Sequence, residues 1–274
     1  MGLVMGDFRV VQRMAQGATS ETWRLESDAR TMSAVGKRLG PRFRDDPTAR
    51  AELDRERRVL DALAGRGAPR LLAAGQDGEG PFLVMEHVHM IAIGNRPLRD
   101  PDERSAFVTR IAASAFDALA TVHEARDSTG PLSVIHGDVS PDNLLASDPP
   151  PGACLVDFGL ATFRDSPSAS SGSVRGTLRT LAPEVARGEP ADARSDLFAL
   201  GLTLLFAASG EHARPGEQAS AVLVQAGEDP VLAYAERAAR GLPPALRQAL
   251  LAAVAFDPEA RPPCVPEAWR RGSW

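Results

Sequence analysis

The chain has 274 residues, of which 43% are hydrophobic and 24% charged, an ordinary globular mixture that excludes disordered and fibrous architectures. This length is enough for one large domain or for two small lobes. The formal net charge of -5 argues against binding nucleic acid or an anionic membrane through bulk charge. The two cysteines, Cys154 and Cys264, cannot form a disulfide framework, so we expect a reducing compartment.

The sequence predicts neither a secretory leader nor a membrane-spanning stretch. No basic segment followed by an apolar one opens it, and its most apolar stretch, residues 197–208, is far shorter than the ~20 residues that span a bilayer. We therefore expect a soluble cytoplasmic protein with no membrane segment and no nucleic-acid partner. The pattern leaves the oligomeric state open.

Short strands and one helix are predicted for the N-terminal part of the chain. Leu53, Leu60 and Leu63 lie on one face of a helix over residues 47–64. Turn residues such as Gly17 and Gly75 separate the apolar or alternating runs. The predicted strands cover residues 8–11, 21–25, 32–35, 70–73 and 82–85.

A mainly helical pattern follows from about Pro97. A strand at residues 153–156 buries Cys154 as a small hydrophobic side chain. Loop-rich stretches occupy residues 134–151 and 157–183. The predicted helices cover residues 102–126, 195–208, 245–256 and 266–271. The layout predicts a strand-rich lobe over residues 1–86, a connector over 87–97 and a larger helical lobe over 98–274.

Lysine usage singles out one residue. Lys37 is the only lysine, so the other 30 of the 31 basic residues are arginine. Arginine can replace lysine where only charge is needed, but it cannot supply a compact ammonium. Glu56 lies on the leucine face of the predicted helix, and a buried carboxylate is costly unless it is paired. We therefore expect Lys37 to pair with Glu56, the alternatives being a surface lysine and a glutamate that reaches solvent.

Oxygen ligands recur at fixed intervals in the second half of the chain. Asp138 and Asn143 are five residues apart in the segment that begins at His136, and Asp157 follows the strand at 153–156 in the sequence Asp-Phe-Gly. Mg²⁺ prefers oxygen ligands and takes only one or two from protein when phosphate and water supply the rest. Each acid alone is more typical of a turn or a helix cap, but the combination indicates a phosphate-linked magnesium site.

The order of these motifs resembles the eukaryotic-like (Hanks-type) serine/threonine protein kinases, in a divergent bacterial form. The resemblance covers almost the whole chain, and it adds the Ala182-Pro-Glu184 motif, Asp196 at the start of the central helix and Arg261 as the partner of Glu184. It implies an α+β, bilobal protein-kinase-like fold, in which a small antiparallel sheet with one helix joins a larger mainly helical lobe.

The resemblance also implies an enzyme that transfers the γ-phosphoryl group of ATP, with Mg²⁺, to a serine or threonine of a protein substrate. Lys37 would bind the α- and β-phosphates and be held by Glu56, and Asp138 would orient the acceptor hydroxyl beside Thr177. Asn143 and Asp157 would ligate Mg²⁺. An apolar spine would comprise His136, Phe158, Leu60 and Leu71. The nucleotide would contact Ala15, Gly17, Ser20, Thr22, Val35, Lys37, Met85 (the gatekeeper), Glu86, Val88, Leu145 and Asp157.

Several positions depart from the family pattern. Of the three glycines of the phosphate-covering loop only Gly17 is present, since Ala15 and Ser20 stand at the other two positions. Thr22 and Val35 narrow the adenine slot. Gly137 stands where an arginine normally reads a phosphorylated activation loop, and Ser140 where a lysine normally touches the γ-phosphate. We expect weaker nucleotide binding, slower transfer and activity that is independent of loop phosphorylation.

Other interpretations remain open. A small-molecule phosphotransferase of the aminoglycoside or choline kinase kind shares the His-Gly-Asp sequence and the asparagine five residues later, but lacks the Ala182-Pro-Glu184 platform. A nucleotide-binding pseudokinase scaffold would explain the eroded glycine loop. His87 and His89 are more typical of a strand or hinge than of a metal site. The serine-rich run, a candidate for autophosphorylation, comprises Ser166, Ser168, Ser170, Ser171 and Ser173.

Overall fold

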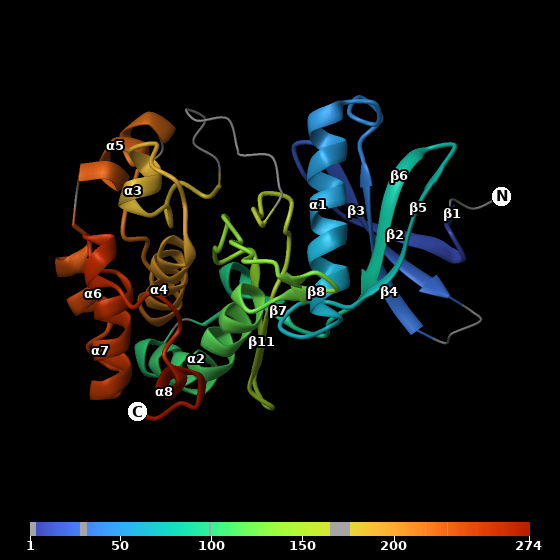
Figure 1. The fold of residues 1–274 in the computed structure, drawn as a ribbon. Coiled ribbons are helices and arrows are strands. Elements are labelled where there is room, and N and C mark those ends of the chain that lie inside the picture. Colours follow the sequence, from blue (N-terminus) through green and yellow to red (C-terminus); the bar gives the residue numbers. More distant parts are fainter. Residues whose placement is uncertain (1–3, 28–31, 99, 165–175, 217, 229) are drawn as a thin grey trace. The chain divides into compact units, whose positions relative to one another are not determined.

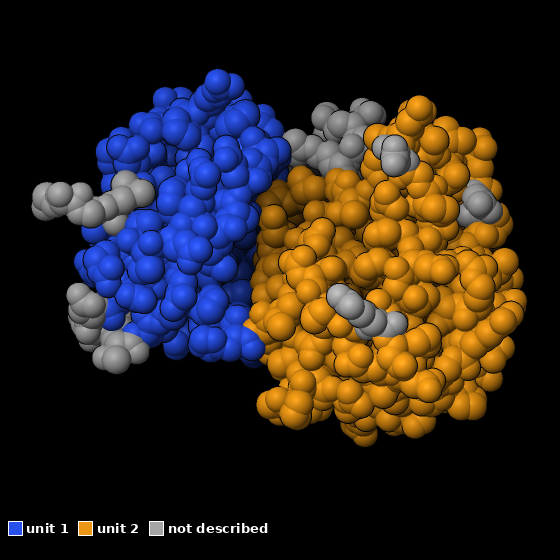
Figure 2. All heavy atoms as spheres, turned by 180° about the vertical axis from the view of Figure 1, so that it is seen from behind, with its two compact units in different colours: residues 1–89 blue, residues 90–274 orange. Residues whose placement is uncertain are grey.

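The structure is a computed structural model, and it describes residues 4–27, 32–98, 100–164, 176–216, 218–228 and 230–274. The chain divides into two compact units, residues 1–89 and residues 90–274 (Figure 2). The predicted connector over residues 87–97 includes this boundary. The serine-rich run from Ser166 to Ser173 lies outside the described residues.

The first unit is an antiparallel sheet with one helix (Figure 1). The strand order is β1-β2-β3-β4-β6-β5, so the strands that carry the predicted nucleotide-binding residues lie in the middle. Met5, Phe8, Leu25, Phe82 and Val84 form a buried apolar cluster on the sheet. The strands are β1 (Val4–Met5), β2 (Phe8–Gln16), β3 (Ser20–Ser27), β4 (Met32–Leu39), β5 (Leu71–Asp77) and β6 (Gly80–Glu86).

The helix of this unit is α1 (Pro47–Leu63), in agreement with the predicted range. Asp46 caps its first turn, since its carboxylate accepts a hydrogen bond from the Ala49 N–H at 2.8 Å. The helix ends at Ala64, which adopts the left-handed conformation with φ 51°. The apolar face contacts β4, β5 and β6 and buries Leu53 and Leu60, as the periodicity predicts.

β2 is longer than the predicted strand at residues 8–11. Its second half is exposed, so the residues from Gln12 to Gln16 carry no alternation of apolar and polar side chains. Backbone pairing with β3 continues nevertheless to the pair Gln16 and Glu21, with two irregularities on the way. The predicted phosphate-covering loop therefore narrows to residues 17–19, because Ala15 lies in β2 and Ser20 in β3.

The second unit is mainly helical and is organised around α4 (Ala193–Ser209), which contacts α2, α6 and α7 (Figure 1). α4 is buried on all sides from Leu197 to Leu205, as its uniformly apolar sequence predicts. The helices α3, α5 and α6 were not predicted. The other helices are α2 (Pro101–His123), α3 (Pro183–Ala186), α5 (Ala219–Glu228), α6 (Leu232–Ala238), α7 (Pro244–Ala253), α8 (Glu267–Arg270) and the 3₁₀ turns η1 (Ile93–Asn95) and η2 (Pro258–Ala260).

Short strands pair into small sheets in the connections between the helices of this unit. β10 (Leu144–Ser147) lies between β11 (Gly152–Leu155) and β7 (Ile91–Ala92), although the sequence predicts only loop around Leu144. β8 (Arg126–Asp127) and β9 (Gly130–Pro131) form a hairpin that ends the predicted helix 102–126 early, at His123. β11 agrees with the predicted strand at residues 153–156, whereas β7, β8, β9 and β10 are two to four residues long, too short for a periodicity to show.

α2 has the length and apolar composition of a helix that could cross a membrane. This is not predicted from the sequence, because the expectation of no membrane segment considers only the most apolar stretch, residues 197–208. Its most apolar window is 56% buried inside the protein. Phe107, Ile111 and Phe116 are fully buried, and the helix packs against α4 and β11. A buried core helix meets the same criteria of length and composition, and that interpretation accounts for α2.

Candidate active site

The predicted pair of Lys37 and Glu56 is present in the first unit. The Lys37 ammonium lies 2.7 Å from Glu56 Oε2, and the two side chains are 13% and 3% exposed. Lys37 is on β4, opposite Thr22 of β3 and Leu83 of β6. Glu56 lies three residues after Leu53 on α1, so the helix that buries its leucines against the sheet also directs this carboxylate inward.

The predicted nucleotide-binding residues of this unit lie on neighbouring strands. Val35 of β4 pairs with Met85 of β6, a gatekeeper candidate that is 7% exposed. After β6 the chain leaves the sheet, and no hydrogen bond engages the backbone of Val88 within the described residues. The N–H of Gly17 donates to the Ser20 carbonyl at 2.8 Å, and an added Cβ at Gly17 would lie 3.3 Å from that oxygen. The turn therefore favours glycine at its first residue.

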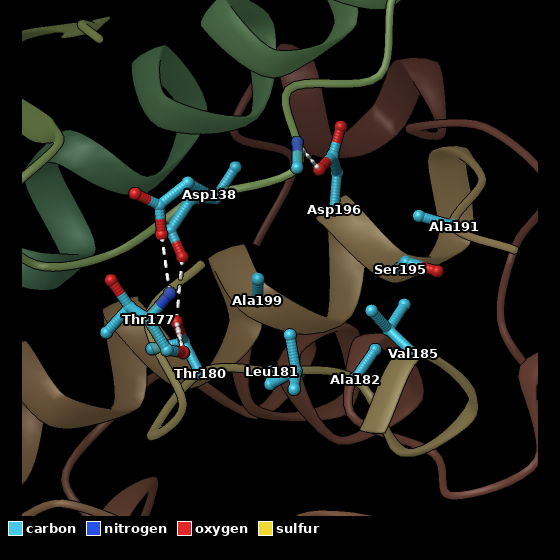
Figure 3. Close-up of a pocket in the computed structure, with 12 residues that line it drawn as sticks. Asp138, Thr177, Thr180, Leu181, Ala182, Val185, Ala191, Ser195, Asp196 and Ala199 are labelled. Carbon is cyan, nitrogen blue, oxygen red and sulfur yellow. Dashed lines mark hydrogen bonds between the residues drawn. The ribbon is translucent and has the colours of Figure 1, made fainter. Parts of the chain in front are cut away.

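Asp138 is the central acid of the second unit. Its Oδ1 accepts a hydrogen bond from the Thr177 N–H at 2.7 Å, and its Oδ2 accepts one from Asn143 Nδ2 at 2.9 Å. Figure 3 shows Asp138 and Thr177 pointing toward each other. Burial raises the pKa of Asp138, while its hydrogen bonds with Thr177 oppose this rise. Both carboxylate oxygens are thus oriented, as a group that positions a hydroxyl requires.

Asp196 holds the backbone that precedes Asp138. This residue, 2% exposed at the start of α4, accepts hydrogen bonds from the N–H groups of His136 at 2.7 Å and Gly137 at 2.9 Å. His123 Nε2 lies 2.9 Å from its Oδ2. Burial alone would raise the pKa of Asp196, but the interactions with His123, His136 and Gly137 lower it. The carboxylate therefore stays ionised and fixes the loop.

Asn143 and Asp157 come together through the pairing of β10 with β11. The Val156 N–H donates to the Asn143 carbonyl at 3.0 Å, which places Asn143 opposite the residue before Asp157. Asn143 Nδ2 donates to both the backbone oxygen and the carboxylate of Asp138, each at 2.9 Å. Since that contact needs the nitrogen, the amide oxygen is left for another partner. Asp157 is exposed and has φ 64°, an unusual conformation of the kind that clusters at functional sites.

These two oxygen donors suit a hard divalent cation that takes its remaining ligands from phosphate and water. Within the described residues, no group of three or more His, Cys, Asp or Glu side chains could hold a metal ion. His87 and His89 pack their rings edge to face at 4.8 Å, and burial lowers the pKa of His87.

The spine residues of each unit lie where the sequence predicts an apolar environment. The rings of His136 and Phe158 are 4.8 Å apart, and both residues are fully buried. Burial lowers the pKa of His136, so the ring is neutral near pH 7. In the first unit Leu60 is buried on α1, and Leu71 begins β5, a strand that α1 contacts.

The segment after Thr177 is fastened to the loop that carries Asp138 (residues 136–143, called the catalytic loop) and to the C-terminal part of the chain. Thr180 Oγ1 donates to the Val139 carbonyl at 2.9 Å (Figure 3). Arg261 binds Glu184 through two parallel hydrogen bonds of 2.7 Å and 2.9 Å, which confirms the predicted pair. A small pocket lies between this segment, the catalytic loop and α4; its apolar lining includes Leu181 (Figure 3).

A family model described as "Protein kinase domain" matches residues 8–262. The chain belongs to this family. Members of the family use ATP and a divalent cation, and the β-rich first unit and helical second unit are the two parts of the fold that the sequence predicts.

Curated bacterial proteins are similar to this kinase domain. "Probable serine/threonine-protein kinase PknB" of Corynebacterium glutamicum is 34% identical over 68% of this chain and 29% of its own length. "Serine/threonine-protein kinase PknJ" of Mycobacterium tuberculosis is 29% identical over 95% of this chain and 44% of its own. "Serine/threonine-protein kinase PknL" of the same species is 28% identical over 93% of this chain and 62% of its own length. The chain therefore spans between 29% and 62% of these relatives.

Two departures of this kinase domain from the family pattern have a structural basis. Gly137 has φ 76°, and an added Cβ would lie 3.0 Å from the Leu160 carbonyl oxygen, so the backbone conformation favours glycine. Ser140 is 1% exposed, and its hydroxyl has no hydrogen-bond partner among the described residues. Neither residue brings a cation to the catalytic loop.

Two sets of contacts in the kinase domain, those of His123 and Arg164, are not predicted from the sequence. His123 carries no motif, although a histidine at the end of an apolar helix that leads to the catalytic loop is a signal that could have been followed. Arg164 donates from its backbone to the Leu132 carbonyl at 2.8 Å and from its side chain to Asp127 at 3.2 Å. Asp127 also accepts from the Thr129 N–H at 2.7 Å, so the β8–β9 hairpin anchors the residues that follow Asp157-Phe-Gly.

Proposed function

We propose that this chain transfers the γ-phosphoryl group of Mg-ATP to a serine or threonine hydroxyl of a protein. The observation that carries the proposal is the orientation of Asp138, whose two carboxylate oxygens are held by Thr177 and Asn143 at 2.7 Å and 2.9 Å. A carboxylate fixed in this way can accept the proton of an acceptor hydroxyl as the oxygen attacks phosphorus.

Each remaining polar residue has a role in this proposal. Lys37 binds the α- and β-phosphates, because its ammonium is oriented by Glu56 and only 13% exposed. The amide oxygen of Asn143 and the carboxylate of Asp157 hold Mg²⁺. Mg²⁺ held by these residues would supply positive charge to the phosphoryl group that is transferred. Val35 and Met85 line the adenine slot, and the backbone of Val88 meets the adenine edge.

A protein acceptor is favoured over a small molecule by the segment from Thr177 to Glu184. This segment is fixed at Asp138, at Val139 and at the buried Arg261, which makes a firm platform beside the catalytic acid. The names of the bacterial relatives, all serine/threonine-protein kinases, support the same acceptor class.

The test incubates the purified chain with γ-labelled ATP and Mg²⁺, a generic protein acceptor and, in parallel, an amino-alcohol acceptor. We expect label on protein, loss of at least a hundredfold in rate for Asp138→Asn and Lys37→Met, and little change for Ser166→Ala. Label on the amino alcohol alone would indicate a small-molecule phosphotransferase. ATP binding without transfer to either acceptor would indicate a pseudokinase scaffold, and the proposal would be wrong.

A further inference from the structure

A tight turn lies directly beside the catalytic acid. The Thr180 N–H donates to the Thr177 carbonyl at 3.0 Å, which closes a four-residue turn. The first residue of the turn binds Asp138 and the last binds the Val139 carbonyl. Leu178 and Arg179 are its two central residues. Any acceptor whose hydroxyl reaches Asp138 therefore passes close to this turn.

Backbone carbonyls, rather than a carboxylate of the described residues, orient the guanidinium of Arg179. Its Nη2 donates to the Gly216 carbonyl at 2.8 Å and its Nη1 to the Arg214 carbonyl at 3.4 Å. Among the described residues, both hydrogen-bond acceptors of Arg179 are backbone carbonyls, and no ion pair with a carboxylate is found. Backbone carbonyls restrict the direction of a guanidinium without cancelling its charge, and two hydrogen bonds leave donors of its five N–H groups over. The side chain is thus prepared for a bidentate anionic partner.

Arg214 and His212 belong to the same segment as the carbonyls that Arg179 binds. Arg214, 2% exposed, donates to the Leu181 carbonyl at 2.6 Å and holds the far end of the segment. The ring of His212 stacks on Phe206 at a centroid distance of 4.4 Å. Burial lowers the pKa of His212, Arg179 lowers it further and Asp142 raises it. Arg179 and Asp142 therefore shift the pKa of His212 in opposite directions.

We propose that Arg179 recognises an acidic side chain of the protein acceptor, so that this kinase domain prefers a serine or threonine with a nearby aspartate or glutamate. The inference rests on the proposed function, because it concerns the acceptor of the same site. A carboxylate that binds the pre-oriented guanidinium brings its hydroxyl neighbour to Asp138 with little further loss of conformational freedom. The overall charge of -5 does not favour acidic acceptors, so the local charge of Arg179 decides the preference.

The experiment uses a series of threonine peptides with a single Glu at each of the three positions before and after the acceptor, each matched by a Gln peptide. For the wild-type chain we expect kcat/KM to favour Glu over Gln by about tenfold at one position. The effect appears in KM rather than kcat, because the carboxylate is bound equally in the ground and transition states. Arg179→Gln removes the preference, and Arg179→Lys restores part of it, since an ammonium keeps the charge but not the fork.

The matched control is Arg247→Gln. Arg247 is exposed on α7, and its substitution leaves the Glu-to-Gln ratio unchanged. Direct peptide binding is measured in parallel by fluorescence polarisation with Asp138→Asn, whose transfer is blocked. If the wild-type chain transfers no phosphate to any peptide, while binding to Asp138→Asn favours Glu and is lost when Arg179→Gln is added, this inference would be supported and the proposed function refuted.

Other outcomes would overturn the role proposed for Arg179. Transfer with equal kcat/KM for Glu and Gln peptides would leave the kinase activity intact and overturn the role of Arg179. A preference for Glu that survives Arg179→Gln, a preference for Gln over Glu at every position, or no peptide binding to Asp138→Asn at millimolar peptide would also overturn it.

Discussion

The buried pair of Arg261 and Glu184 offers the strongest test of how this fold is held together. Arg261 is fully buried, donates to both oxygens of Glu184, and also donates to the carbonyls of Ala255, Arg194 and Phe256 at 2.7, 3.2 and 3.1 Å. Arg261→Ala leaves the Glu184 carboxylate, only 5% exposed, without its cationic partner, while the Ser195 hydroxyl still donates to its Oε1. An uncompensated buried charge of this kind lowers the free energy of unfolding by about 3–5 kcal/mol.

Urea unfolding at pH 7, followed by circular dichroism, measures this loss. The matched control is Arg271→Ala, because Arg271 contacts Glu267 at 2.8 Å while both side chains are more than half exposed, at 73% and 60%. An exposed pair contributes about 0–1 kcal/mol. If the two substitutions cost the same, burial is not what makes the Arg261 pair strong, and the reasoning fails.

The pH dependence of the same pair follows from its charge. Burial alone would raise the pKa of Glu184, but hydrogen bonds from Arg261 and Ser195 lower it below its ordinary value of 4.5. The stabilisation is therefore present above that value and is lost as the pH falls through the lowered pKa. In Arg261→Ala the Glu184 carboxyl loses the hydrogen bonds from Arg261 that lower its pKa, so it takes up a proton at a higher pH than in the wild type. The difference in unfolding free energy between wild type and variant consequently shrinks as the pH is lowered from 7.

Three further substitutions test the site. Asp196→Asn, measured by steady-state kinetics, lowers kcat by at least tenfold with little change in the KM for ATP, because one amide end can no longer accept the His136 or Gly137 N–H. Gly137→Ala lowers the unfolding free energy by about 1–3 kcal/mol in urea melts, since φ is 76° and the new Cβ lies 3.0 Å from the Leu160 carbonyl oxygen. Thr22→Val tightens ATP binding several-fold in calorimetric titrations, because the slot then has no hydroxyl that must give up its water when the adenine binds. Unchanged affinity would place Thr22 away from the adenine.

Side chains on regular elements could be placed from the sequence, because periodicity fixes which face they occupy. The spacing of Leu53, Glu56 and Leu60 on α1 predicts that the carboxylate shares the buried face, and the Lys37 contact at 2.7 Å confirms the pairing. The bidentate contact between Glu184 and Arg261 is likewise found as the resemblance to protein kinases implies.

Contacts between side chains and the backbone could not be placed in this way. The bonds from the N–H groups of His136 and Gly137 to Asp196 leave no trace in residue type, because every non-proline residue carries an N–H group. The exposed half of β2 lacks the alternation of a half-buried strand, and the β8–β9 hairpin is only two residues long on each side. Such features depend on tertiary pairing, which propensity and periodicity do not encode.

Arginine and lysine differ in how their hydrogen-bond donors are arranged, and Arg261 and Lys37 make correspondingly different contacts. Arg261 binds two oxygens of one carboxylate and three carbonyls, so its fork is saturated by groups of the protein itself. Lys37 meets Glu56 through one oxygen at 2.7 Å, and an ammonium directs its three donors apart rather than along one plane. A carboxylate and a second anion can therefore share it. In a chain that uses arginine for 30 of its 31 basic residues, the one lysine lies at this contact, as the proposed binding of ATP phosphates by Lys37 predicts.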